Sequence, residues 1–90
     1  MVELKIKLST IEDLYLFSET VSKISFTAVA KQDNYCVNAK SIFSIISLNL
    51  MKDFTLVIFL PEGLKEDELE AKFIAAEMRG KFQAWIIIWF

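Results

Sequence analysis

The stretch Val37–Leu48, which reads VNAKSIFSIISL, decides the fold predicted for this chain of 90 residues. Ser41 precedes three isoleucines that recur at three- and four-residue steps, a spacing that places them on one face of a helix. They are Ile42, Ile45 and Ile46. A serine directly before such a run accepts a hydrogen bond from the free N–H groups of the first helical turn. The stretch therefore predicts a short helix that Ser41 caps.

The residues on either side of this helix predict strands. Residues 25–31 alternate between apolar and polar side chains, which is typical of a strand with one buried face. Residues 32–34 (QDN) suit a tight turn, and residues 35–37 (YCV) favour a short return strand, so the three segments together predict a hairpin. Residues 54–60 are almost continuously apolar, which indicates a central strand.

A strand and a helix are predicted at the start of the chain. Residues 2–8 alternate strictly between apolar and charged side chains, the pattern of a half-buried strand. Ser9 and Glu12 then fit a capping box, which predicts the start of a helix that ends near Lys23. Its apolar stripe consists of Ile11, Leu14, Phe17, Val21 and Ile24.

A last helix is predicted over residues 65–79. Turn residues at 61–63 precede it, acidic side chains stand early in it, and Gly80 is expected to end it. Its apolar stripe consists of Leu69, Phe73 and Ala76. Together these elements predict an α+β domain over residues 1–80, an open-faced sandwich with a four-stranded antiparallel sheet and three helices on one face.

The remaining residues, 81–90, form an apolar C-terminal tail. If this tail were exposed, it would present more contiguous apolar surface than a monomer normally tolerates. We therefore expect another part of this chain or a second copy to cover it. It could form an extra strand, pack across the outer face of the sheet, or pair with a second copy. Anchoring to a membrane surface is disfavoured because the tail has no basic cluster. The candidate self-association residues are Phe82, Trp85, Trp89 and Phe90.

Composition excludes several classes of function. A net charge of -2 offers no attraction for nucleic acid, and the single cysteine, Cys36, excludes an internal disulfide and a multi-cysteine metal site. Histidine, a cysteine pair and a glycine-rich phosphate loop are all missing from the sequence, so we expect neither an enzyme nor a bound metal or cofactor. The chain shows no signal peptide and no apolar run long enough to span a bilayer, and a reducing, cytoplasmic location is expected.

Residues 37–48 resemble the regulatory-serine motif of the HPr phosphocarrier family of bacterial sugar transport. That motif reads V-N-[LA]-K-S-I-M-G, followed by two hydrophobic residues and S-L. The main departures here are Phe43 for methionine and Ser44 for glycine. The order of predicted elements is also similar to the HPr fold, and the resemblance covers about Val2 to Arg79.

The resemblance implies roles for the residues of the short helix. Ser41 falls on the serine that an HPr kinase/phosphorylase phosphorylates in Gram-positive bacteria. Its neighbours fall on a patch that contacts partners, and at helical spacing Phe43 is the one most expected to point outward. The candidate partner-binding residues are Lys40, Ser41, Ile42, Phe43 and Ile46.

The carrier site of the family is missing from this chain. The family's histidine lies in a G-[IL]-H-A-R-P stretch before the first helix, whereas this chain reads STIED at residues 9–13 and contains no histidine. A serine or threonine phosphate ester is too inert to replace a phosphohistidine. Glu12 and Asp13 also place carboxylates where an incoming phosphate would bind, and they would repel it.

Two hypotheses of function follow. In the first, the chain is similar to the histidine-less catabolite-repression relatives of HPr in the phosphotransferase system. It would then be a non-catalytic regulatory domain that binds protein partners, such as an HPr kinase or a transcription regulator, with Ser41 phosphorylation as the candidate control. In the second, it is a structural domain that forms a homo-oligomer through its C-terminal tail, and Ser41 is only a helix cap.

Overall fold

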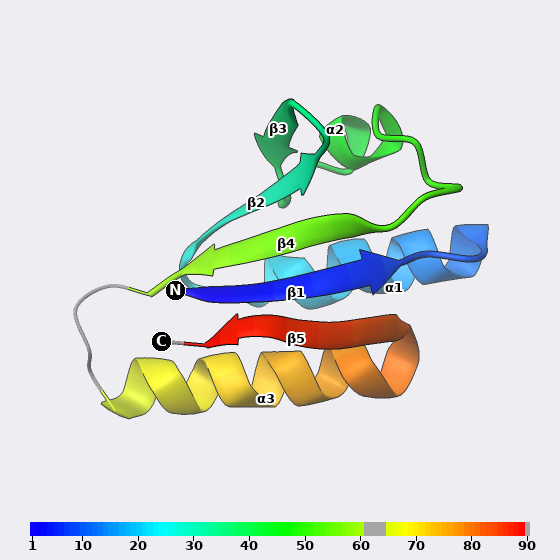
Figure 1. The fold of residues 1–90 in the computed structure, drawn as a ribbon. Helices are drawn as coiled ribbons and strands as arrows, with labels where there is room; N and C mark the ends of the chain where they lie inside the picture. The colour runs from blue at the N-terminus through cyan, green and yellow to red at the C-terminus, as the bar shows by residue number, and fades with distance from the viewer. Residues whose placement is uncertain (61–64, 90) are drawn as a thin grey trace.

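The computed structural model describes residues 1–60 and 65–89, and the side-chain surroundings of residues 1–60 and 68–85. Figure 1 shows the order of the elements along the chain. They are β1 (Val2–Lys7), α1 (Ile11–Ser22), β2 (Thr27–Gln32), β3 (Tyr35–Asn38), α2 (Ile42–Ile46), β4 (Phe54–Phe59), α3 (Lys65–Lys81) and β5 (Gln83–Trp89). The turn predicted at residues 61–63 lies outside the described residues.

The strands form one antiparallel sheet in the order β3-β2-β4-β1-β5. β4 lies between β2 and β1, which confirms the central position predicted from its apolar sequence. Leu56 of β4 lies opposite Leu4 of β1 and Ala30 of β2, and all three residues are buried. The predicted hairpin is β2–β3, and its turn contains Asp33 at a φ of 54°, a left-handed conformation that aspartate tolerates.

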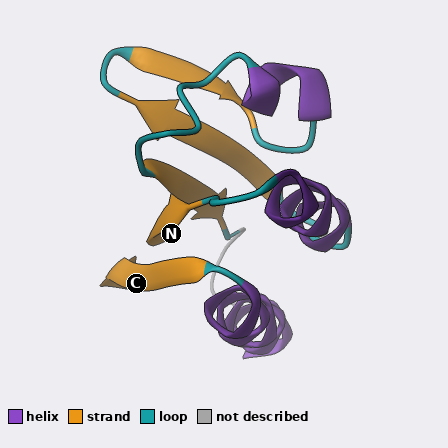
Figure 2. Cartoon of the chain, turned by 90° about the vertical axis from the view of Figure 1, so that its right-hand side faces the viewer, coloured by secondary structure: helices purple, strands orange, loops and turns teal. Residues whose placement is uncertain are grey.

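The helices cover one face of the sheet and leave the other face open (Figure 2). This arrangement confirms the α+β open-faced sandwich. The core between helices and sheet includes Phe17 of α1, whose ring lies edge-on to Phe54 at 5.3 Å between centroids. Phe17 also contacts the ring of Phe82 at 6.2 Å. α1 ends at Ser22 with Lys23 as its C-cap, which agrees with the predicted end near Lys23.

The start of α1 differs from the predicted capping box by one residue. Thr10, not Ser9, is the N-cap, and its Oγ1 accepts a hydrogen bond from the amide of Asp13 at 3.1 Å. The Asp13 carboxylate reaches back to accept a bond from the Ser9 amide at 2.9 Å. Both neighbouring hydroxyl residues suit a cap, and the shorter aspartate takes the role expected of Glu12.

Helix α3 differs from its prediction in two respects. It continues through Gly80 to Lys81, because a glycine permits the end of a helix but does not require it. The predicted apolar stripe of Leu69, Phe73 and Ala76 faces solvent. The residues that α3 buries against the sheet are Ala71, Ile74, Ala75 and Met78.

The C-terminal tail supplies the sheet with an additional strand. The prediction of four strands is therefore wrong for the described residues, which form five, and the extra-strand alternative is the one observed. β5 pairs antiparallel with β1 from Lys7 opposite Gln83 to Val2 opposite Trp89, with an irregularity between Glu3 and Leu4. This pairing satisfies the backbone of β1 on both sides and makes β1 an interior strand.

Candidate functional site

The candidate site is the α2 surface, formed by the predicted partner-binding residues Lys40, Ser41, Ile42, Phe43 and Ile46. The end of β3 sets the entry to α2, because the Asn38 side chain accepts a bond from the Lys40 amide at 2.9 Å. Ser41 is the N-cap in an extended conformation, and its Oγ accepts from the Ser44 amide at 3.4 Å. The capping role predicted for Ser41 is thus observed.

The side chains of α2 divide into one that is buried in the core and others that are exposed to solvent. Ile45 is fully buried and holds α2 on the core. Phe43 exposes 83% of its area, Ile46 is also exposed, and Ser41 and Ile42 are partly buried. The α2 surface therefore places a hydroxyl beside two apolar side chains in solvent.

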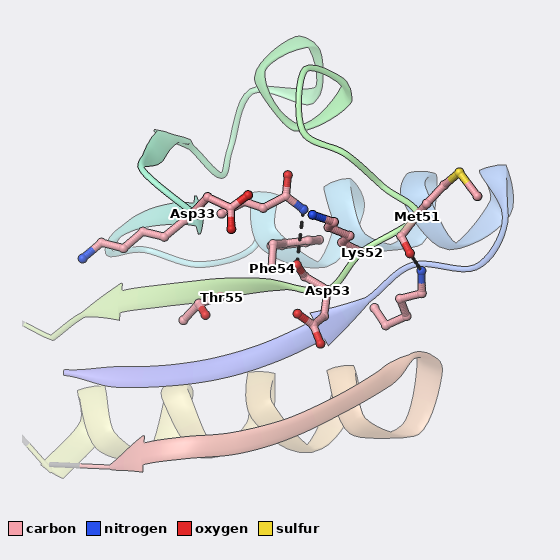
Figure 3. A pocket seen from close by; sticks show the side chains of 9 residues that line it. Asp33, Met51, Lys52, Asp53, Phe54 and Thr55 are labelled. Carbon is pink, nitrogen blue, oxygen red and sulfur yellow. Dashed lines mark hydrogen bonds between the residues drawn. The ribbon is translucent and has the colours of Figure 1, made fainter.

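The loop that follows α2 is fastened to two strands. The Gln32 amide group accepts a bond from the Asn49 amide at 2.8 Å and donates to the Asn49 carbonyl at 2.8 Å. It also donates to the Asp53 carbonyl at 3.2 Å, and Lys7 donates to the Met51 carbonyl (Figure 3). These hydrogen bonds hold the loop between α2 and β4 in place. The Met51 side chain adds little apolar packing to them, because it is exposed.

A cavity of about 400 Å³ lies where this loop meets the sheet (Figure 3). Three lysines and two aspartates are among its lining residues. They are Lys7, Lys31, Lys52, Asp33 and Asp53. The charges are mixed and some are already engaged, since Asp53 lies 3.9 Å from Lys5 and Lys7 holds the loop backbone. The cavity consequently offers no concentrated positive field for a phosphate.

A second cavity, of about 260 Å³, lies at the start of α1 where the family resemblance would place a phosphocarrier site. Its lining consists of Leu8, Ser9, Thr10, Ile11, Leu14, Leu50 and Met51. None of these side chains is ionisable, and the Ser9 amide is already bound by Asp13. The lining of this cavity therefore contains no imidazole that could carry a phosphate and no cationic side chain that could pair with one.

Sequence reasoning missed the exposed apolar residues of this second cavity. Ile11 was expected in the buried stripe of α1, but its side chain is exposed in the first turn of the helix. Met51 was not singled out, because it belongs to no periodic segment. The signal for Met51 is its place between Asn49 and Lys52 in a loop, since a large apolar residue there has no strand or helix face to bury it.

The tail residues lie in different surroundings. Phe82 is buried against Phe17, so its side chain is not available at the surface. Trp85 exposes 46% of its area on β5, opposite Lys5, and Trp89 is the strand partner of Val2. Phe90 lies outside the described residues.

Two further properties concern the described residues as a whole. Residues 1–60 and 68–85, whose side chains the structure describes, contain no cluster of three or more histidine, cysteine, aspartate or glutamate side chains that could bind a metal ion, and Cys36 is exposed. None of the helices in this part of the chain is long and apolar enough to cross a membrane.

The chain is similar to solved structures of HPr proteins. It aligns with HPr-C-His from Thermoanaerobacter tengcongensis at a TM-score of 0.64 and 27% identity, over 92% of this chain and 97% of that one. It aligns with the phosphocarrier protein HPr from Bacillus anthracis str. Ames at a TM-score of 0.58 and 23% identity, over 86% of this chain and 95% of that one. No family model and no curated protein matches the sequence. The structural alignments confirm the resemblance to HPr that residues 37–48 indicated.

Proposed function

We propose that this chain is a non-catalytic, HPr-like regulatory domain that binds protein partners through the α2 surface. The observation that carries the proposal is the exposure of Phe43 beside Ser41 on a helix that Ile45 anchors to the core. A large aromatic side chain held in solvent by a rigid element is a typical anchor of a protein interface. The proposal includes a cytoplasmic location and partners such as an HPr kinase or a transcription regulator.

The start of α1 supports binding rather than phosphate transfer. A phosphocarrier needs an imidazole that forms a labile phosphoramidate, and the chain contains no histidine. In place of a free helix N-terminus, α1 has the Thr10 cap and the Asp13 carboxylate, which already accept bonds from backbone amides. A phosphate approaching this turn would meet negative charge from Glu12 and Asp13.

Phosphorylation of Ser41 is the proposed control. A kinase would transfer the γ-phosphoryl group of ATP to Ser41 Oγ, releasing ADP and the hydroxyl proton. A phosphate at the helix start is compatible with the N-cap position, so we expect α2 to persist. Its charge would lie next to Phe43 and would change which partners the α2 surface accepts.

Incubation with a purified HPr kinase/phosphorylase and ATP tests the control. Intact-mass spectrometry is expected to show one added phosphate on the wild type and none on Ser41→Ala. Ser41→Asn is the second negative control, since asparagine keeps a capping side chain but has no hydroxyl. Ser44→Ala should still accept one phosphate. An unmodified wild-type protein would contradict phosphorylation at Ser41 but not the fold.

Titration calorimetry with the same kinase, in the absence of ATP, tests binding by the α2 surface. Phe43→Ser should weaken binding about tenfold or more, as expected for an aromatic anchor. Phe59→Ser is the matched control because Phe59 is an exposed aromatic residue on β4, away from α2. Equal affinity for the wild type and Phe43→Ser would show that the α2 surface does not bind this partner.

Self-association through the C-terminal tail is the alternative proposal. Trp85 supports it, because a half-exposed tryptophan lies on β5, the last strand of the sheet. Light scattering of the wild type and Trp85→Lys tests it, and an oligomer that the substitution dissociates is the expected result. A wild type that is monomeric at high concentration would contradict this alternative.

A further inference from the structure

The solvent face of α3 carries an apolar stripe that takes no part in the core. Leu69 exposes 55% of its area and Phe73 exposes 67%. Ala76, which is exposed, and Gly80 continue the stripe, and a Cβ added at Gly80 would meet nothing within 4 Å. Because α3 also buries a different apolar face, this stripe is a second one and needs its own explanation.

The spacing of the stripe is that of a coiled-coil seam. Leu69, Phe73, Ala76 and Gly80 follow one another at steps of four, three and four residues. These steps match alternating d and a positions of a heptad, the positions at which one helix packs against another helix. A stripe at such spacing suits a helix as its partner better than a sheet or a small molecule.

The two flanks of the stripe carry opposite charges. Glu70 and Glu77 occupy the e positions on one flank, which lies beside the C-terminal end of α1 and the residues that follow it. Ser25 donates to Glu70 at 3.1 Å, and Lys23 donates to Glu77 at 3.3 Å. On the other flank, Lys72 and Arg79 occupy the g positions.

This charge arrangement selects one orientation for a symmetric pair of α3 helices. In a parallel pair related by a two-fold axis along the helices, the g flank of each copy faces the e flank of the other. Lys72 of one copy then lies near Glu77 of its partner, and the same contact occurs twice. In an antiparallel pair, like flanks face each other, so Lys72 and Arg79 of both copies would gather on one side and repel one another.

We infer that α3 pairs in parallel with α3 of a second copy of this chain, through a seam of Leu69, Phe73 and Ala76 flanked by contacts between Lys72 and Glu77. Glu77 has an oxygen for this contact. Its bonds to Lys23 and Lys81 both go to Oε1, so among the described residues Oε2 is left for Lys72 of the second copy. The contact is separate from the α2 surface and does not depend on the proposed function.

The seam is short, so we expect a weak dimer. It spans fewer residues than an interface of the usual size, which buries about 800 Å² on each partner. Sedimentation equilibrium of the full chain over a range of concentrations should show a monomer–dimer equilibrium. Phe73→Ser should raise the dissociation constant at least about tenfold. The matched control is Tyr15→Ser, because Tyr15 is an aromatic residue of α1 that is 62% exposed. A strictly monomeric wild type, or an unchanged equilibrium in Phe73→Ser, would overturn the inference.

Cysteine cross-linking tests the orientation. In a Cys36→Ser background, which removes the exposed native thiol, single cysteines are introduced as Leu69→Cys or Gly80→Cys. A parallel pair brings each position opposite itself, so each variant alone should form a disulfide dimer under mild oxidation. Ser22→Cys, an exposed position on α1, is the control for random collision. Disulfides that form only when the two variants are mixed would show an antiparallel pair, and dimer yields equal to the Ser22→Cys control would show no pair. Either result overturns the parallel contact.

Discussion

Helices α1 and α3 cover the same face of the sheet, but they present different kinds of surface to it. α1 buries large side chains, with Phe17 and Val21 fully inaccessible to solvent. α3 buries two alanines, Ala71 and Ala75, together with Ile74 and Met78, while its largest apolar side chain, Phe73, lies in solvent. The comparison teaches that the size of side chains, as well as their periodicity, selects the face that a helix buries.

The two helices differ because of how close each can approach its neighbours. Small residues allow α3 to lie near β5 and α1, and Met78 fills the remaining space. A phenylalanine on that face would hold the helix away from the sheet. Phe73 and Leu69 therefore face outward even though they are more hydrophobic than the buried Ala71 and Ala75.

The largest difference in stability is expected between alanine variants of Phe17 in α1 and Phe73 in α3. Phe17→Ala removes a ring that packs on Phe54 and Phe82 and should cost about 3–5 kcal/mol of unfolding free energy. Phe73→Ala should change it by less than about 0.5 kcal/mol. Urea unfolding at low protein concentration measures both, and Phe17→Leu serves as a milder variant if the alanine variant does not fold. Equal losses in the two alanine variants would contradict the assignment of faces.

Neighbouring alanines of α3 give the next largest effect. Ala75 is buried and Ala76 is exposed, so the same substitution tests both faces of one helix. Ala75→Leu should destabilise the fold by about 1–3 kcal/mol because the close contact has no space for three more carbons. Ala76→Leu should be nearly neutral, since leucine is also a good helix former. Urea unfolding of the two variants checks the difference, and a larger loss in Ala76→Leu would reverse the assignment.

The cap of α1 gives a smaller effect. Thr10→Ala removes the acceptor for the Asp13 amide and should cost about 1 kcal/mol, whereas Thr10→Ser should retain most of the stability. Ser9→Ala is the matched control because Ser9 is bound through its backbone amide. Thermal unfolding monitored by circular dichroism measures the three variants. If Ser9→Ala were the more damaging change, the capping box would start at Ser9 after all.

The smallest effect concerns the two ion pairs of Glu77, one with Lys23 at the end of α1 and one with Lys81 within α3. Hydrogen bonds from Lys81 and Lys23 lower the pKa of Glu77, although partial burial opposes this shift. A lowered pKa means that Glu77 stabilises the fold above the carboxyl pKa of the unfolded chain, and that this contribution is lost as the pH falls through the folded-state pKa. Glu77→Gln should therefore cost about 0.2–1 kcal/mol at about pH 7 and nothing at about pH 2.

Urea unfolding of wild type and Glu77→Gln at the two pH values checks this expectation. Added salt should reduce the difference at neutral pH, because the pairs are partly exposed. A difference that grows as the pH falls would contradict the direction of the pKa shift.

Periodic segments were predictable from the sequence, and long-range choices were not. The alternation of residues 2–8 and the spacing behind Ser41 each specify one face, so β1 and α2 appear where they were predicted. α3 has two apolar faces, and periodicity alone cannot say which one meets the sheet. The apolar composition of the tail indicated that it is buried, but it could not identify β1 as its partner. That pairing depends on residues far away in the sequence.

The candidate site was predictable to a similar degree. The cap at Ser41 follows from local chemistry, and α2 exposes Phe43 as its spacing indicated. Ile11 and Met51 were missed because their exposure depends on where the first turn of α1 and the loop after α2 leave the sheet.

The pairing of β1 with β5 has a consequence for folding during synthesis on the ribosome. Val2 is synthesised before β4 and α3, whereas its strand partner Trp89 is added only after both of them. Until then, β1 can pair with β4 and α1 can dock, while one edge of β1 stays open and the space for Phe82 stays unfilled. We expect the nascent chain to pass through a four-stranded intermediate that is prone to aggregation until β5 pairs with the open edge of β1.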